Sequence, residues 1–329
     1  MAVQTNTENG VPFYKIGTIG GKADAYISKE LFDEYKMKYS FPRKGEVMIT
    51  CAGTVGKCII YNGEDSYYQD SNIVWIDNPN EILLNDFLYH LLCKVNWLHL
   101  NSTTIVRIYN DDLRNLKLYY PRHNEQKKIT HFLQLINERI TTQNKIIGKL
   151  QSLIKGLTNQ LLIPNSNWQP TTIGQVLTIN SGKDYKHLKE GNIPVYGTGG
   201  YMLSVNDYLY DGESVCIGRK GTIDKPIFLT GKFWTVDTLF YTSNFNSLLP
   251  RFGYYLFKTI DWLKYNEASG VPSLSKVSIE KIHISLPSLE IQNSICRLLD
   301  SIYDKLALEE SVLNNHQTQK AFILKQMFI

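Results

Sequence analysis

The chain repeats itself, and this duplication constrains its fold more than any other feature of the 329 residues. One block reads YYPRHNEQKKITHFLQLINERI, and a later block reads SLPSLEIQNSICRLLDSIYDKL. Within them, Pro121 and Gln126 match Pro287 and Gln292, each pair being 166 positions apart. A repeat of so long a period predicts one structural unit that is used twice.

The repeat extends upstream of these blocks. GTVGK at 53–57 parallels GTIDK at 221–225, 168 positions later, and VPFY at 11–14 parallels IPVY at 193–196, 182 positions later. The separation differs because the first copy carries 14 additional residues between the two segments, in a stretch that includes KADAYISKELFDEYKMKYS. We expect this insertion to be a surface loop. Each repeat is therefore a globular segment followed by a helix.

Each repeat ends in a stretch whose apolar residues follow a heptad pattern, which predicts the seam of a coiled coil. The seam of the first stretch consists of Ile129, Leu133, Ile136, Ile140, Gln143, Ile147, Leu150, Ile154, Leu157 and Leu161. The seam of the second stretch consists of Ile295, Leu299, Ile302, Leu306, Leu313, Ile323 and Met327, with interruptions at Glu309, His316 and Lys320. About 40 residues of helix would be roughly 60 Å long.

Because the two apolar stripes are of similar length, we expect the two helices to bury them against each other as an antiparallel pair. Gln143 is expected to help fix the register of this pair. The alternative is that each helix packs only on its own globular unit. The sequence predicts an α+β fold with globular domains at 1–121 and 164–287 and long helices at 122–163 and 288–329. Runs such as GEVMITCAGTVGKCIIY predict strands around tight turns.

Composition limits the class of protein. Lys and Arg number 35 against 31 Asp and Glu, a net charge of +4 that permits an anionic partner without requiring one. Five widely spaced cysteines without a CxxC pair favour reduced thiols in the cytoplasm over disulfides or a zinc site. The polar N-terminal segment does not resemble a signal peptide, and without a run of about 18 apolar residues we expect no membrane span.

The two glycine–threonine loops are the most suggestive local motifs. Glycines allow close backbone approach, and hydroxyl and cationic side chains around them suit contacts with DNA phosphates or base edges. An ordinary turn with solvated lysines is equally compatible with either loop. The candidate DNA-binding residues are Lys22, Thr54, Lys57, Arg107, Ser181, Lys183, Lys186, Thr198, Tyr201, Arg219, Lys220, Thr222 and Lys225.

Motifs for catalysis are missing from the sequence. Gly53 and Gly56 are too close together for a nucleotide-binding P-loop, and Cys58 follows Lys57 where that motif needs Ser or Thr. The chain has no amino-methyltransferase tetrapeptide and no convincing cluster of nuclease carboxylates. Its seven histidines are not at metal-ligand spacing. We therefore expect no catalytic residue, no metal and no cofactor in this chain.

The order of motifs resembles the specificity subunit of type I restriction–modification systems. In the second half the resemblance rests on Trp168, 172–174, 181–183, 193–197, 212–213, 219–223, 269–270, 286–287 and Gln292. In the first half it rests on 45–47, 53–57, Pro121, 125–126 and 157–162. The first half lacks a counterpart of the segment from Trp168 to Lys183, since only 11 residues precede Pro12.

The resemblance implies a function and a set of partners. Two target-recognition domains each read one half of a bipartite double-stranded DNA target, and an antiparallel coiled coil sets the spacer between the halves. Two methyltransferase subunits that bind S-adenosylmethionine dock on the helices, and restriction and motor subunits that use ATP complete the complex. The chain itself catalyses nothing. The alternatives are a coiled-coil scaffold with repeated protein-binding domains and a sequence-independent DNA- or RNA-binding protein.

Overall fold

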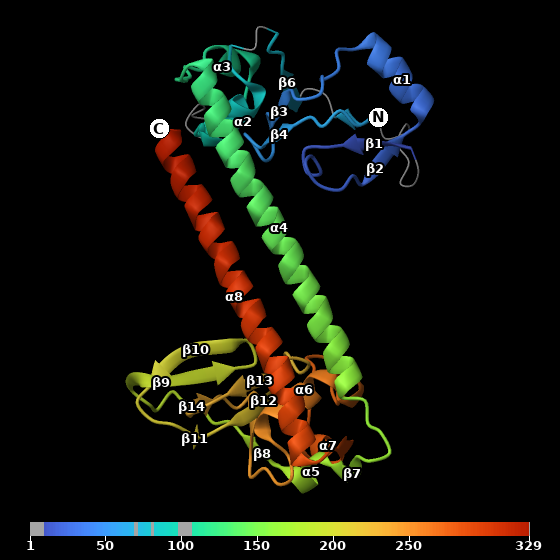
Figure 1. Cartoon of the computed structure of the whole chain (residues 1–329), viewed down its shortest axis with the longest axis vertical. Helices are drawn as coiled ribbons and strands as arrows, with labels where there is room; N and C mark the ends of the chain where they lie inside the picture. Colours follow the sequence, from blue (N-terminus) through green and yellow to red (C-terminus); the bar gives the residue numbers. More distant parts are fainter. Residues whose placement is uncertain (1–9, 69–71, 80–81, 98–106, 329) are drawn as a thin grey trace. The chain divides into compact units, whose positions relative to one another are not determined.

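The computed structural model describes residues 10–68, 72–79, 82–97 and 107–328 (Figure 1). The chain divides into two compact units, residues 1–142 with 313–329, and residues 143–312. Each unit combines one globular domain with parts of the two longest helices, α4 (His123–Leu161) and α8 (Leu289–Met327). Within the described ranges, no helix combines the length and the apolar character that crossing a bilayer demands.

The globular domain of the first unit contains two small sheets. One has the order β2-β1-β5 and consists of β1 (Val11–Tyr14), β2 (Ala25–Ile27) and β5 (Tyr67–Tyr68). The other has the order β4-β3-β6 and consists of β3 (Val47–Thr50), β4 (Cys58–Ile60) and β6 (Ile73–Ile76). The helices are α1 (Lys29–Lys38), α2 (Asn85–Lys94) and α3 (Asn110–Arg114). The stretch of the insertion was predicted to be a surface loop, but part of it forms α1, because Phe32 packs into a buried cluster with Phe13 and Ile27.

The globular domain of the second unit is larger. One sheet has the order β13-β12-β15-β8 and consists of β8 (Thr178–Ser181), β12 (Ser214–Gly218), β13 (Ile227–Leu229) and β15 (Leu239–Ser243). A second has the order β10-β9-β14-β11 and consists of β9 (Glu190–Gly197), β10 (Gly200–Val205), β11 (Tyr210–Asp211) and β14 (Lys232–Thr235). The remaining elements are β7 (Gln169–Thr172), which pairs with β16 (His283–Leu286), and the helices α5 (Ile173–Val176), α6 (Pro250–Thr259), η2 (Trp262–Tyr265) and α7 (Lys276–Glu280).

The two domains share one plan, which confirms the duplication and the mixed helix and sheet content predicted from the sequence. The sheet β4-β3-β6 matches β13-β12-β15, and β2-β1-β5 matches β10-β9-β14. In each domain the second of these sheets contains one parallel pair, β1 with β5 or β14 with β9. The second domain also contains β8, which pairs along β15, whereas β6 has no such neighbour among the described residues of the first domain.

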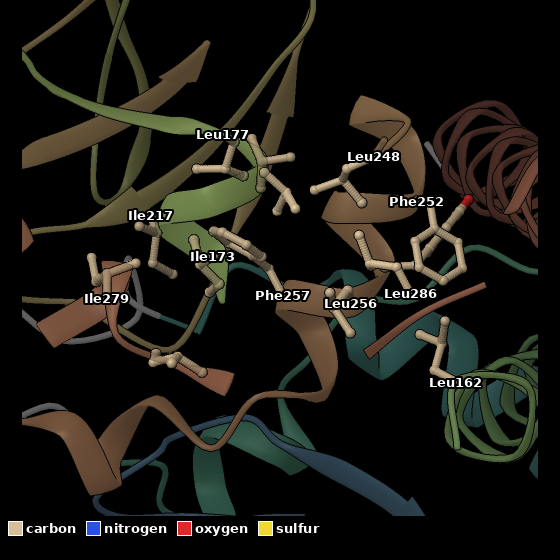
Figure 2. Close-up of a cluster of buried hydrophobic side chains, with 14 of the residues drawn as sticks. Leu162, Ile173, Leu177, Ile217, Leu248, Phe252, Leu256, Phe257, Ile279 and Leu286 are labelled. Atoms are coloured by element: carbon tan, nitrogen blue, oxygen red, sulfur yellow. The ribbon is translucent and has the colours of Figure 1, made fainter. Parts of the chain in front are cut away.

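The core of the second unit joins its domain to both long helices. Ile173 of α5, Ile217 of β12 and Phe252 and Phe257 of α6 belong to one buried cluster (Figure 2). Leu299 of α8 lies in the same cluster and is fully buried, and Leu161 of α4 packs against it. Burying a leucine of this kind stabilises the fold by about 1.5–3 kcal/mol, so the domain and the adjoining helix ends form one cooperative body.

A fully buried glutamine ties each long helix to its domain in the same way. The amide of Gln126 accepts from Leu84 N at 2.8 Å and donates to Ile82 O and Pro121 O at 3.1 and 2.9 Å. The amide of Gln292 accepts from Leu249 N at 2.8 Å and donates to Ser247 O and Pro287 O at 2.9 and 3.0 Å. Leu84 and Leu249 are the N-cap residues of α2 and α6, so each glutamine satisfies a backbone N–H that a helix start leaves open.

The apolar stripe of α4 lies on the face of the helix that is covered. Each of its ten positions from Ile129 to Leu161 is buried or half-buried. In the second unit the amide of Gln143 donates to Glu309 O of α8 at 3.0 Å and also to the Glu309 carboxylate. The polar residue that interrupts the apolar stripe of α4 therefore contacts one of the polar residues that interrupt the stripe of α8. Because Gln143 contacts Glu309 whereas Leu161 packs on the cluster of Leu299, the two helix segments of this unit run antiparallel.

One residue of the second stripe was placed wrongly. Met327 is 40% exposed, whereas the neighbouring Phe328 is 7% exposed and lies in a cluster with Phe87 and Leu133. The rings of Phe87 and Phe328 have centroids 5.1 Å apart. The aromatic ring buries more apolar surface against α2 than the thioether would, so packing against the domain overrides the heptad spacing at this end of α8.

Candidate nucleic-acid interface

An open pocket of about 770 Å³ lies in the second domain, where the ends of β8 and β12 meet the turn before β15. Its lining brings together segments that are far apart in the sequence. The lining residues are Ser181, Arg219, Lys220, Asp237, Thr238, Phe240, Glu267, Ala268, Val271, Ser273, Leu274, Ser275 and Lys276. Three of these side chains are cationic, and the side chains of Arg219, Lys220 and Lys276 are exposed. Such a pocket suits a polyanion.

Backbone hydrogen bonds fix the Arg219–Lys220 segment from two sides. Arg219 N and Lys220 N both donate to Thr238 O, at 2.8 and 3.2 Å. On the other side, Leu274 N donates to Arg219 O at 2.9 Å. The cationic side chains therefore project from a rigid frame, as recognition of a fixed ligand geometry requires.

The glycines of this region are needed for close backbone contacts. A Cβ on Gly218 would lie 2.0 Å from Thr222 O, and Gly221 has a φ of +98°, which side chains disfavour. A Cβ on Gly182 would lie 2.0 Å from Val236 O. The glycines of the Ser-Gly-Lys and Gly-Thr motifs are therefore required for packing, because they let β8, β12 and the turn before β15 approach one another closely.

The loop from Glu267 to Ser275 closes one side of the pocket. Ser275 Oγ donates to Glu267 Oε1 at 2.7 Å, and Glu267 N donates to Ser273 O at 3.0 Å. Hydrogen bonds from Ser275 and Ser278 lower the pKa of Glu267, which keeps this carboxylate ionised and engaged inside the loop. Glu267 is thus a structural anchor of the pocket.

The structure brings some of the predicted DNA-binding residues together and leaves others apart. Ser181, Arg219 and Lys220 line the pocket, and Thr198 is near it, since its Oγ1 would be 3.5 Å from a Cβ on Gly221. Lys186 and Tyr201 line a different hollow, of about 610 Å³. Lys183 and Lys225 are exposed and Thr222 is half-buried, but none of the three lines either space.

The matching loop of the first domain is organised differently. Lys57 Nζ donates to Ile19 O at 2.5 Å, so this ammonium already stabilises the domain. The guanidinium of Arg107 lies over the ring of Tyr109 at 5.8 Å, and Ile108 N donates to Cys51 O at 2.9 Å, next to the loop. Thr54 and Lys22 are exposed. At the repeat offset of 166, the counterpart of the Glu267–Ser275 loop is residues 101–109, of which 107–109 belong to the described part of the chain.

Three thiols surround this first-domain loop. Cys51 and Cys58 are buried at its two ends, and Cys93 of α2 is exposed. A hydrogen bond from Cys58 lowers the pKa of Cys93 to about 7, with Tyr89 adding a second hydrogen bond. The same interaction with Cys93, together with burial, raises the pKa of Cys58. In the described residues, no group of three or more His, Cys, Asp or Glu side chains could hold a metal ion.

Several pocket residues were not identified from the sequence. Asp237, Thr238 and Lys276 lie in the turn before β15 and at the start of α7, segments that no motif of the loops themselves indicates. The Ser269-Gly270 pair belongs to the loop that closes the pocket, and its presence among the second-half motifs that carry the family resemblance was the available signal.

Comparison with known proteins places these features in a family. The chain matches the type I restriction modification DNA specificity domain twice, over residues 2–152 and 165–316. It is 51% identical over 130 residues to a Haemophilus influenzae protein described as type I restriction enzyme specificity subunit S.HindORF215P, a match that covers 40% of this chain and 34% of that one. It is 22% identical over 140 residues to the EcoprrI specificity subunit of Escherichia coli, covering 39% of this chain and 34% of the relative. Each match thus spans about a third of the relative's length.

Solved structures show the same fold. The S subunit of a type I restriction–modification system from M. genitalium superimposes with a TM-score of 0.66 at 19% identity, over 100% of this chain and 91% of that one. A chain from a study of complex assembly and conformational transition of the type I R-M system superimposes with a TM-score of 0.59 at 14% identity, over 98% of this chain and 92% of that one.

Proposed function

The chain belongs to the type I restriction modification DNA specificity family, and we propose that it is the subunit that selects the DNA sequence on which a type I restriction–modification complex acts. Each globular domain reads one half of a bipartite target. The observation that supports this best is the second-domain pocket, in which Ser181, Arg219 and Lys220 converge on a backbone frame held by hydrogen bonds.

The chemistry of the pocket suits double-stranded DNA. Arg and Lys neutralise phosphates and position a protein on the duplex, whereas hydrogen bonds to base edges carry the sequence information. The pocket combines exposed cations with Ser181 and Thr238 hydroxyls and an acidic side chain, Asp237. This mixture suits contacts with phosphates and with base edges, and a sequence-independent binder would not need the base-edge contacts.

The long helices are proposed to form an antiparallel coiled coil that sets the spacer between the two half-sites. The covered stripe of α4, and the contact of Gln143 with Glu309, support such a pairing. A helix rises 1.5 Å per residue, so a pair of 39-residue helices is long enough to separate two domains by several base pairs.

Outside the seam, both helices carry exposed apolar side chains that suit docking of two methyltransferase subunits. Phe132 and Leu153 of α4 are 43% and 48% exposed, and Leu298 and Leu308 of α8 are 45% and 58% exposed. In this proposal the methyltransferase subunits hold S-adenosylmethionine and the motor subunits hold ATP. The chain supplies sequence recognition and no catalytic group.

The proposal is tested by binding and activity assays on separate preparations. The complex of this chain with its methyltransferase subunits should bind one bipartite duplex in preference to a scrambled duplex, with an affinity that falls steeply with salt. The chain alone, freed of partners, should transfer no methyl group and cleave no DNA. Equal affinity for both duplexes would contradict the proposal and favour a sequence-independent nucleic-acid-binding protein, whereas no affinity for either would favour the scaffold alternative. Methyl transfer by the isolated chain would contradict the claim that it supplies no catalytic group.

A further inference from the structure

Asp237 places a second carboxylate, besides that of Glu267, in the pocket of the second domain. Arg219, Lys220 and Lys276 line the same space. Arg219 Nη1 donates to the backbone carbonyl of Asp237 at 3.5 Å, and within the described ranges the exposed carboxylate itself has no ion-pair or hydrogen-bond partner. Its acceptor capacity is therefore uncommitted, unlike that of Glu267, which Ser275 Oγ engages at 2.7 Å.

The position of Asp237 is fixed by the backbone on both sides. Leu239 N donates to Val236 O at 2.9 Å, which closes a turn around Asp237 between β14 and β15. Thr238 O accepts from Arg219 N at 2.8 Å, which ties this turn to the end of β12. The carboxylate is thus presented from a rigid element, as a group that reads a base must be.

The charge of Asp237 decides which part of DNA it can face. Phosphates repel a carboxylate, so its presence in a phosphate-binding pocket weakens non-specific binding. In the major groove, however, the exocyclic amino groups of cytosine and adenine are hydrogen-bond donors that a carboxylate can accept from. Resting on the proposed function, we propose that Asp237 determines specificity by accepting a hydrogen bond from cytosine N4 or adenine N6, while Arg219 and Lys220 contact the adjacent backbone.

The duplication supports this role for the turn. In the first half of the sequence, Asp70-Ser71 stands 167 positions before Asp237-Thr238, between β5 and β6, which match β14 and β15. Residues 69–71 lie outside the described part of the chain, so the comparison is one of sequence. An acidic residue followed by a hydroxyl residue thus occurs at matching positions of the sequence in both repeats.

The test compares Asp237→Ala, which removes both carboxylate acceptors, with the wild-type chain, each assembled with the methyltransferase subunits. The target is first obtained by selecting bound duplexes from a random library, and affinities are then measured for every single base-pair substitution. The variant should lose about tenfold to a hundredfold of discrimination at one C·G or A·T pair, within one half-site. Discrimination elsewhere and melting temperature should be unchanged, and affinity for non-target DNA should not fall.

The matched control is Asp211→Ala, which removes the same carboxylate from an exposed residue of β11 outside the pocket and should leave every preference unchanged. Base analogues then identify the amino group. Duplexes with pyrimidin-2-one in place of the cytosine, or purine in place of the adenine, should bind the wild-type complex at least tenfold more weakly and the Asp237→Ala complex without further loss.

Two outcomes separate the inference from the function on which it rests. A sequence-selective wild-type complex whose Asp237→Ala variant keeps the same preference at every position would overturn the role of Asp237 alone. A wild-type complex without any sequence preference would overturn the proposed function as well.

Discussion

Lys57 and Lys220 belong to matching loops, yet their surroundings differ. Lys220 is exposed beside a cationic pocket, whereas Lys57 Nζ donates to Ile19 O at 2.5 Å. Lys220→Ala should weaken DNA binding by the complex and reduce its salt dependence by about one unit if the residue contacts a phosphate. Lys57→Ala should chiefly lower the free energy of unfolding, by about 1 kcal/mol.

Salt titrations of binding and thermal melts of both variants distinguish these roles. Lys264, an exposed lysine of η2 outside the pocket, provides the control substitution. If Lys220→Ala binds with unchanged affinity, salt slope and specificity, the second-domain loop is an ordinary turn. An unchanged melting temperature for Lys57→Ala would contradict the structural role of Lys57.

Cys93 is expected to be the most reactive thiol in the described part of the chain. Because the thiolate is the nucleophile and the pKa of Cys93 is lowered to about 7, its alkylation should accelerate as pH rises through about 7 and then level off. Burial raises the pKa of Cys216 to about 12, so that thiol should remain slow. Iodoacetamide labelling followed by peptide mass spectrometry measures both. A Cys93 rate that still climbs steeply between pH 8 and 9 would refute the lowered pKa.

At the scale of elements, the buried glutamines Gln126 and Gln292 attach each long helix to its globular domain by hydrogen bonds. Gln292→Ala would leave Leu249 N, Ser247 O and Pro287 O without their partners, and should cost about 2–4 kcal/mol of unfolding free energy. Gln319→Ala, at an exposed position of α8, should change stability by less than about 0.5 kcal/mol. Denaturant unfolding measures the free energy of unfolding of both variants. Equal values would show that Gln292 does not stabilise the attachment of α8 to its domain.

Elements were predicted well from the sequence where a single period decided them. The heptad spacing identified the covered stripe of α4 because each position of a long helix faces a direction set by its number. The end of α8 departs from the heptad spacing, since Phe328 packs on Phe87 and Met327 is exposed.

The pocket was predicted only in part. Asp237 sits on a turn whose neighbours depend on the pairing of β12 with β15 and on the loop after η2, and no local pattern encodes such long-range contacts.

At the scale of the whole molecule, the proposed coiled coil makes the helix length a determinant of the DNA target. Inserting four residues into α4 near Leu157, with four more into the facing part of α8, adds about 6 Å, close to two base pairs at 3.4 Å each. The insertion also rotates the downstream domain by about 40°, against about 70° for two base pairs, so bending must absorb some mismatch. We expect the spacer to lengthen by one or two base pairs with both half-sites unchanged.

Sequencing of the methylated sites of this insertion variant measures the spacer. An equal insertion into the exposed loop at residues 207–208, outside both helices, should leave it unchanged. A functional insertion variant that still methylates at the original spacing would refute the role of the helices in setting the spacer, while leaving DNA recognition by the domains intact.

The central claim is that this chain selects the DNA sequence for enzymes that it accompanies. The most direct measurement maps methylated adenines across the genome of cells that carry the partner methyltransferase subunits, with and without this chain. The account predicts one bipartite motif that is methylated only when the chain is present. A methylation pattern that is the same in both strains would contradict it.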